Sequence, residues 1–189
     1  MELYKGIFKR MPQIRTERLL LRKIKMIDAQ DMYDYASRPE VTRYLLWYEH
    51  PDLSYTKRYI AYVDTQYRAG KFYDFAIIER ESKRMIGTCG FARLNSEKNT
   101  GEIGYVLHPS FWGRGYATEA VQAIIRFGFE KLGLCRIEGR YMANNLASRR
   151  VMEKCGMQLE GVYPDLMVIK GRPEAVGICA ILADKRTRE

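Results

Sequence analysis

The chain has 189 residues, of which 47% are apolar and 29% charged, a balance typical of a single globular domain. This composition excludes a disordered or fibrous protein, and the longest apolar run of note, Val176 to Ala183, is too short to span a membrane. The net charge is +9, and the first 25 residues alone contribute eight basic and two acidic side chains. We therefore describe residues 1–13 as a basic N-terminal extension. Because the N-terminus lacks the apolar run of a signal peptide, we expect a cytoplasmic protein with no membrane partner.

The cysteine pattern argues against a structural metal site. The four cysteines are widely spaced without a CxxC pair, and the chain has only two histidines. Cysteines of this kind usually behave as small buried apolar residues. We expect all four to be reduced core residues: Cys89, Cys135, Cys155 and Cys179.

The N-terminal third predicts one strand followed by two helices. The strand is expected at Arg18 to Ile24, which has an apolar centre between charged flanks. A first helix is expected to begin at Asp28 and to end at Arg38-Pro39. Ser54 is expected to open a second helix, which Gly70 ends.

The middle of the chain predicts an antiparallel meander. Two apolar segments, Phe72 to Glu79 and Met85 to Ala92, flank a polar turn and are typical of a hairpin. A third strand is expected at Gly101 to Leu107, after a second polar loop. The glycines inside this strand permit a bulge.

The C-terminal half predicts a strand–helix–strand unit and a closing hairpin. An amphipathic helix follows the turn at residues 112–116 and continues to Leu132. Four further elements are expected in chain order: a strand at Cys135 to Met142, a helix at Leu146 to Cys155, and a hairpin of Met167 to Ile169 with Ala175 to Leu182. The order indicates a mixed α+β domain.

The glycine-rich turn is the first candidate for chemistry. Glycines at the start of a helix let the backbone approach a ligand, and the unpaired N–H groups there favour a phosphate or pyrophosphate. Residues 112–118 have this design but lack the GxxxxGK[ST] motif, and Thr118 stands where a dinucleotide fingerprint needs its last glycine. Taken alone, the turn fits a tight strand-to-helix connection without a ligand equally well.

Three spaced motifs together resemble the GCN5-related N-acetyltransferase (GNAT) family, within it the branch that acetylates the N-termini of ribosomal proteins. The resemblance covers Ile14 to Ala183, and the N-terminal segment Thr16 to Arg22 also matches that branch. The motifs are Glu102 to Pro109, Phe111 to Ala120, and Asn145 to Met157.

The resemblance implies a mixed, mostly antiparallel sheet whose two central parallel strands splay apart and hold acetyl-CoA between them. The glycine turn would bind the pyrophosphate, the strand near Val106 and Leu107 would bind the thioester carbonyl, and Asn145 would bind the pantetheine arm. The implied cofactor-binding residues are Tyr105, Val106, Leu107, Trp112, Gly113, Arg114, Gly115, Tyr116, Ala117, Thr118, Asn145 and Ser148.

The sequence departs from the family pattern at two positions. Trp112 stands where the glycine motif usually begins with Gln or Arg, and Met152 stands where many members have a tyrosine that acts as general acid. Ser148, one helical turn earlier, is the remaining candidate acid, although a helix-surface or capping hydroxyl is the alternative. Glu102 is the candidate base, directly or through water, against the alternative of a solvent-facing charge. We interpret His108, which precedes a proline, as a surface residue.

The family resemblance implies an acceptor pocket near the first two helices. Its candidate substrate-binding residues are Tyr33, Trp47, Tyr48 and Glu102. The predicted activity is direct transfer of an acetyl group to a protein N-terminal α-amine, with a ribosomal protein as partner.

Three other functions remain open at this point. They are acetylation of a small-molecule amine (an aminoglycoside, a polyamine or an amino-acid derivative), acyl-CoA binding without turnover, and RNA binding through the basic first 25 residues. We expect no direct role for nucleic acid, and the chain is either a monomer or a homodimer.

Overall fold

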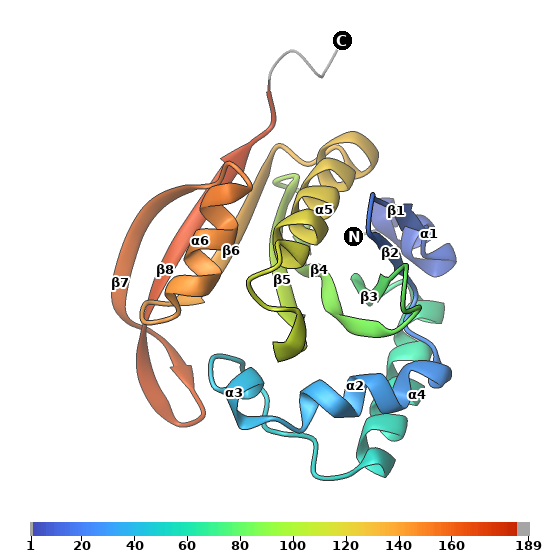
Figure 1. Cartoon of the computed structure of the whole chain (residues 1–189). Coiled ribbons are helices and arrows are strands. Elements are labelled where there is room, and N and C mark those ends of the chain that lie inside the picture. The colour runs from blue at the N-terminus through green and yellow to red at the C-terminus, as the bar shows by residue number, and fades with distance from the viewer. Residues whose placement is uncertain (1, 185–189) are drawn as a thin grey trace.

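The structure is a computed structural model that describes residues 2–184 (Figure 1). Its helices are α1 (Glu2–Arg10), α2 (Ala29–Ala36), α3 (Pro39–Thr42), α4 (Leu53–Ala69), α5 (Tyr116–Leu132) and α6 (Leu146–Lys154), with 3-10 turns at Met26–Asp28 and Pro109–Phe111. Its strands are β1 (Ile14–Arg15), β2 (Leu19–Arg22), β3 (Asp74–Glu79), β4 (Met85–Asn95), β5 (Thr100–Leu107), β6 (Arg136–Met142), β7 (Gln158–Ile169) and β8 (Arg172–Leu182).

All the strands form one sheet in the order β1-β2-β3-β4-β5-β6-β8-β7. Neighbouring strands pair antiparallel except β5 and β6, which are parallel because α5 connects them. This parallel pairing covers only Thr100–Ile103 against Arg136–Gly139. The rest of β5 pairs with β4 alone and the rest of β6 with β8 alone, so the expected splayed α+β architecture is confirmed.

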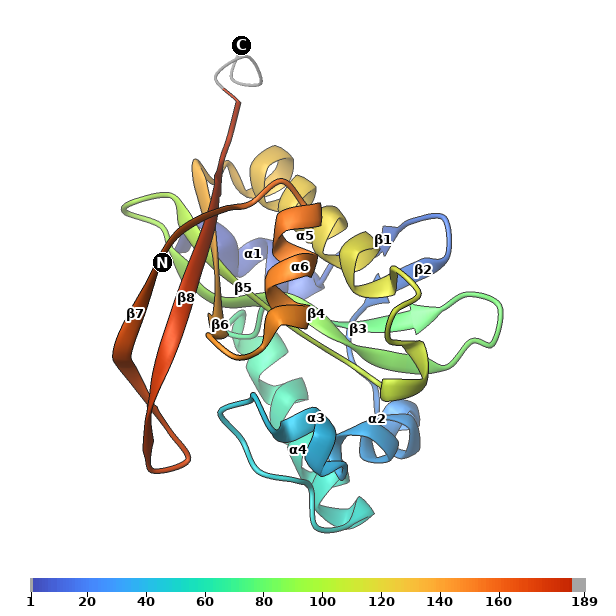
Figure 2. The ribbon, with the colours of Figure 1, turned by 60° about the vertical axis from the view of Figure 1, so that its left-hand side comes forward.

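Helices cover both faces of the sheet. Figures 1 and 2 show α5 and α6 on one side of the central strands, with α2 and α4 on the other. Successive side chains of a strand point to opposite faces of the sheet, so adjacent residues on β3 pack against different layers of helices. Phe75 packs edge-on against Phe127 of α5, with ring centroids 5.9 Å apart, whereas Asp74 interacts with Tyr59 of α4. We call these sides the α5/α6 face and the α2/α4 face.

The two long helices begin and end at residues that supply their caps. The expected start of α4 at Ser54 is wrong by one residue, because the Asp52 side chain accepts a hydrogen bond from the Tyr55 N–H and the helix begins at Leu53. Gly70 and Gly133 end α4 and α5 in the left-handed conformation, with φ angles of 66° each.

The N-terminal extension contains a helix that the sequence analysis did not expect. Phe8 of α1 is fully buried, and its ring lies 4.8 Å from Tyr73 and 6.2 Å from Phe127. The helix therefore contributes to the core between α4 and α5. The basic side chains on its solvent side hid this role.

The closing hairpin is much longer than predicted. The first strand was expected only at Met167–Ile169, but β7 begins at Gln158. Most of β7 is exposed, and Pro164 together with a left-handed Asp165 (φ 54°) interrupts the alternation that signals a strand. Edge strands often carry such irregularities, and they weaken the sequence signal.

Two expectations about burial were wrong. His108 was expected at the surface but is only 7% exposed, because its ring packs against Phe111 and its Nδ1 accepts a hydrogen bond from the Ser110 N–H. Cys89, Cys155 and Cys179 are buried free thiols as expected, whereas Cys135 is only partly buried before β6 and its thiol contacts the Lys98 carbonyl.

Within residues 2–184, no helix combines the length and the apolar character that crossing a bilayer requires.

Candidate functional site

The separation of β5 from β6 forms the centre of the candidate site. The last paired residues are Ile103 and Gly139, and beyond them the two strands pair only with their outer neighbours. Beyond this point no backbone hydrogen bonds join the two strands. They separate into a wedge, with Gly104 to Leu107 on one side and Arg140 to Met142 on the other. A narrow acyl chain with amide groups suits such a wedge, because the facing backbone edges offer hydrogen-bond partners to it.

The glycine turn lies at the α5 end of this wedge. Gly113 and Gly115 have φ angles of 71° and 82°, a conformation that favours glycine. Gly115 caps α5, and the first helical hydrogen bond comes from the Glu119 N–H to the Gly115 carbonyl. The N–H groups of the first turn, from Tyr116 to Thr118, thus have no partner within the helix. Residues 112–115 are exposed, so the turn is open to a pyrophosphate.

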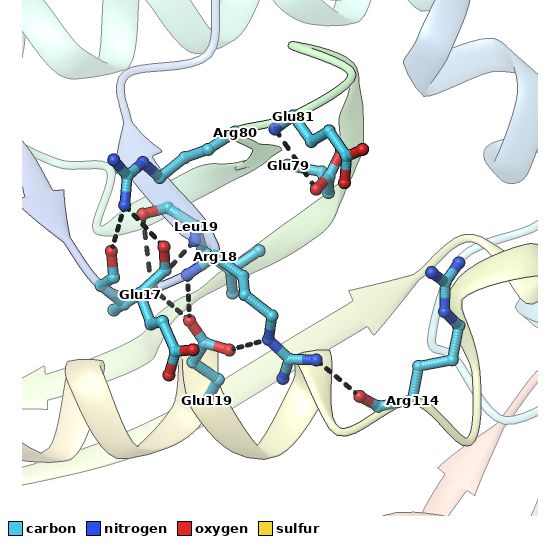
Figure 3. Close-up of polar contacts among 9 residues, drawn as sticks. Glu17, Arg18, Leu19, Glu79, Arg80, Glu81, Arg114 and Glu119 are labelled. Atoms are coloured by element: carbon cyan, nitrogen blue, oxygen red, sulfur yellow. Dashed lines mark hydrogen bonds and ion pairs between the residues drawn. The ribbon is translucent and has the colours of Figure 1, made fainter.

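A polar network anchors this turn to the N-terminal strands (Figure 3). Glu119 accepts hydrogen bonds from the Thr16 hydroxyl at 2.6 Å, from the Arg18 N–H at 2.9 Å and from Arg18 Nε at 2.7 Å. Partial burial alone would raise the pKa of Glu119, but these hydrogen bonds hold it below its ordinary value. Arg80 donates to the Thr16 and Glu17 carbonyls and so fixes the same segment from β3.

Arg18 also contacts the glycine turn itself. Its Nη1 donates to the Arg114 carbonyl at 3.0 Å, and its guanidinium stacks 4.4 Å from the Tyr116 ring centroid. In a trans peptide the C=O and the following N–H point in opposite directions, so holding the Arg114 carbonyl turns the Gly115 N–H away from Arg18. No local sequence pattern marks Arg18 and Glu119 as site residues, because their roles depend on a contact between segments about a hundred residues apart.

Tyr105 and Ser148 form a hydroxyl pair on the α5/α6 face. Tyr105 lies on β5, and its hydroxyl is 2.8 Å from Ser148 Oγ and 2.9 Å from the Ser148 carbonyl. Burial raises the pKa of the Tyr105 hydroxyl, so it keeps its proton at neutral pH. Asn145 accepts a hydrogen bond from the Ser148 N–H and caps α6, which holds Ser148 next to Tyr105. Ser148 is thus part of a pair of proton donors.

Glu102 and Arg140 face each other on the opposite side of the sheet. Glu102 Oε2 lies 3.4 Å from Arg140 Nε, and the two side chains are 19% and 31% exposed. Arg140 Nε is buried and has no hydrogen-bond partner among the residues that the structure describes. Because strand side chains alternate, Glu102 projects to the α2/α4 face while Tyr105 projects to the α5/α6 face. The candidate base and the hydroxyl pair thus belong to different sides of β5.

Met152 has a structural place in the core. It is 1% exposed, and a Cβ atom on Gly139 would lie 2.8 Å from its terminal methyl group. Met152 thus packs α6 onto β6. Met152 therefore has no proton to donate, and Ser148 is the hydroxyl that α6 brings to Tyr105 of β5.

The candidate acceptor residues come together only in part. Trp47 and Tyr48 lie in segment 43–52 between α3 and α4, where the Trp47 ring is 5.5 Å from His50. The turn of the β7–β8 hairpin reaches this segment, because Lys170 Nζ donates to the Thr42 carbonyl at 2.9 Å and lies 5.0 Å from the Tyr48 ring centroid. Tyr33 is partly buried on α2.

Comparisons with known proteins agree with this geometry. The family model for the acetyltransferase (GNAT) domain matches residues 18–158. The N-acetyltransferase p20 of Bacillus licheniformis is 38% identical over 162 residues, which are 86% of this chain and 91% of that protein. A ribosomal protein uS5-alanine N-acetyltransferase of Escherichia coli is 24% identical over 177 residues, 88% of this chain and 90% of that protein.

Solved structures show the same architecture. A GNAT-family acetyltransferase from Bacillus anthracis has a TM-score of 0.80 and 30% identity, and the match covers 90% of this chain and 98% of that one. A ribosomal L7/L12 α-N-protein acetyltransferase in complex with coenzyme A has a TM-score of 0.78 at 20% identity, over 92% of this chain and 99% of that one. The second likeness concerns the fold alone.

Proposed function

We propose, from the premise that the chain belongs to the acetyltransferase (GNAT) family, that it transfers the acetyl group of acetyl-CoA directly to the α-amine of a protein N-terminus. It is an N-acetyltransferase with acetyl-CoA as its donor, and the proposal concerns the acceptor and the residues. The observation that carries it is the wedge between β5 and β6 with the open glycine turn at its end.

The donor is proposed to bind along the wedge. The N–H groups of Gly115 and the first turn of α5 would receive the pyrophosphate, and the other residues from Trp112 to Thr118 would shape the turn around it. Val106 and Leu107 would offer backbone N–H groups to the thioester carbonyl as its oxygen becomes negative. Asn145 would contact the pantetheine arm with the part of its amide that does not cap α6.

Proton transfers are assigned to the two sides of β5. The Tyr105–Ser148 pair would protonate the leaving CoA thiolate, and Glu102 would take a proton from the attacking nitrogen, directly or through water. No covalent enzyme intermediate is needed, because the amine attacks the thioester itself.

A peptide acceptor suits the charge near Glu102. Arg140 Nε is buried without a hydrogen-bond partner among the described residues, and a peptide carbonyl would supply the acceptor for its N–H. Two carboxylates already balance the Arg140 charge, Glu102 at 3.4 Å and Glu138 at 3.8 Å, so this site offers a hydrogen bond to a neutral carbonyl rather than a binding site for a further cation. The likeness to the ribosomal protein uS5-alanine N-acetyltransferase supports an N-terminal acceptor, with Tyr33, Trp47 and Tyr48 proposed around its side chains.

Calorimetry with acetyl-CoA tests the donor site. Gly115→Glu places a carboxylate in the pyrophosphate turn, and we expect a loss of affinity of about 100-fold or more from steric block and charge repulsion. Gly133→Glu is the matched control: it has the same left-handed conformation at the other end of α5, and nothing lies within 4 Å of an added Cβ. Equal affinity of the two variants would refute the assignment.

The acceptor is tested with wild-type enzyme and acetyl-CoA. A peptide with a free N-terminal alanine should release CoA, whereas the same peptide with a blocked N-terminus and an internal lysine should not. Acetylation of spermidine or an aminoglycoside instead of the peptide would overturn the peptide acceptor and leave the donor site standing.

A further inference from the structure

We propose that Asp74 is the carboxyl group that receives the ammonium group of the acceptor and accepts its first proton. The inference rests on the proposed function and deepens it. The family resemblance does not point to this residue. Asp74 is the first residue of β3 and lies on the α2/α4 face of the sheet.

The strand register places Asp74 in a row that leads to the wedge. Asp74 pairs with Gly90 of β4, and Gly90 pairs with Gly104 of β5, the first residue beyond the parallel pairing with β6. Neither glycine carries a side chain that would stand between the Asp74 carboxyl and β5. Adjacent strands are about 4.8 Å apart, so one strand spacing separates Gly90 from the wedge.

The Asp74 side chain leans across β4 in this direction. A Cβ atom on Gly90 would lie 2.9 Å from Asp74 Oδ1, so the carboxyl occupies the space above that glycine. Thr88, two residues away on β4, donates a hydrogen bond to the carboxyl from the same face, and the Phe75 N–H donates to Oδ1 at 3.2 Å. The carboxyl is therefore held over β4, and residue 74 keeps part of its surface exposed.

The position of Asp74 complements the hydroxyl pair. Asp74 and Glu102 share the α2/α4 face, whereas Tyr105 and Ser148 meet on the α5/α6 face. An amine that attacks a thioester held between β5 and β6 needs a base on its own side and an acid on the side of the leaving thiolate. The two faces of the sheet provide this arrangement.

The surroundings of Asp74 suit a proton acceptor at neutral pH. Burial raises the pKa of Asp74 to about 7, partly opposed by the hydrogen bonds from Thr88 and Phe75. The titratable groups that face it are Tyr35 of α2 and Tyr59 and Tyr67 of α4, and Cys89 of β4 lies nearby on the other face of the sheet. All four have pKa values raised by burial and are neutral at this pH. The pKa of Asp74 therefore lies close to the pKa of about 8 of an α-amine.

The proton balance uses both carboxyl groups. The ammonium gives one proton to Asp74, and the free amine nitrogen attacks the thioester carbon to form the C–N bond. The nitrogen gives its second proton to Glu102 as the tetrahedral species collapses and the C–S bond breaks. The CoA thiolate takes one proton from the Tyr105–Ser148 pair, which is restored through solvent. One acetyl group is transferred and one proton is released.

The test compares pH profiles of kcat/KM for whichever amine of the panel above is turned over. The wild type should rise through an acidic limb near pH 7 and stay level above it, because ionised Asp74 takes the first proton of the ammonium and the free amine present above about pH 8 needs no such base. Asp74→Asn should lose about tenfold near pH 7, where only about one tenth of the amine is unprotonated, recover above the pKa of the amine, and bind acetyl-CoA within about twofold of wild type. Glu79→Gln, which removes a buried carboxylate from the same strand, should keep the wild-type acidic limb.

A second variant keeps the test valid if Asp74→Asn does not fold. Thr88→Val removes a hydrogen bond that favours the ionised form of Asp74, so the acidic limb should move to higher pH. An unchanged limb in Thr88→Val, or the wild-type acidic limb in Asp74→Asn, would overturn the role of Asp74 without affecting the proposed activity. Bound acetyl-CoA without turnover of any amine would overturn both.

Discussion

The two faces of β5 differ in how they are built. On the α5/α6 face, the glycine turn and the cap of α6 are local features, and backbone N–H groups supply most of the proposed contacts with the donor. On the α2/α4 face, the proposed groups are side chains from separate strands: Glu102 of β5 pairs with Arg140 of β6, and Asp74 lies on β3 beyond β4. The difference indicates that one face is suited to a constant ligand and the other to a variable one, because substitutions change side chains but leave backbone groups in place.

Removing the two hydroxyls of the Tyr105–Ser148 pair is the strongest test of this difference between the faces. Tyr105→Phe and Ser148→Ala should each lower kcat by about 100-fold, and the double variant should lose little more, because the two hydroxyls act as one unit. Initial rates at saturating acetyl-CoA measure this effect. Tyr73→Phe, at a partly buried tyrosine that packs on Phe8 away from the wedge, is the matched control. Additive losses would show that only one hydroxyl transfers the proton and that the other has a separate role.

Removal of Arg18 tests whether the turn on the α5/α6 face depends on its anchor. Arg18→Ala takes away the donor to the Arg114 carbonyl and the partner of Glu119, so acetyl-CoA affinity should fall about tenfold while the KM for the acceptor stays constant. Arg84→Ala is the control, because Arg84 pairs with Asp31 and Asp34 at similar exposure. A change in acceptor KM equal to the change in donor affinity would contradict the division between the faces.

The smallest expected effect concerns Lys170, where the turn of the β7–β8 hairpin contacts the proposed acceptor segment. Lys170→Met removes the hydrogen bond to the Thr42 carbonyl and the cation on Tyr48, so the KM for the acceptor should rise about threefold. Acetyl-CoA affinity should not change. Lys57→Met alters an exposed lysine of α4 and serves as the reference. A weaker donor affinity in Lys170→Met would place the hairpin turn on the donor side.

Local patterns predicted most elements but few of the tertiary contacts. The α5 helix and its flanking glycines were correct, since an apolar stripe and left-handed residues are local signals. The same reasoning missed α1 and most of β7, because charged or irregular residues mask their packing. It also placed His108 at the surface, because its contact with Phe111 follows from the 3-10 turn rather than from residue type.

The sequence by itself determined the family motifs, the open glycine turn, and the candidates Glu102 and Ser148, because each depends on residues close together in the chain. Only the tertiary structure decided where β5 and β6 separate, that Tyr105 shares a hydrogen bond with Ser148, and that Asp74 lies two strands from β5 in the row through Gly90 and Gly104. Those relations follow from strand register and from packing between distant segments. A one-residue change of register would turn Asp74 to the other face of the sheet, and no local pattern contains that information.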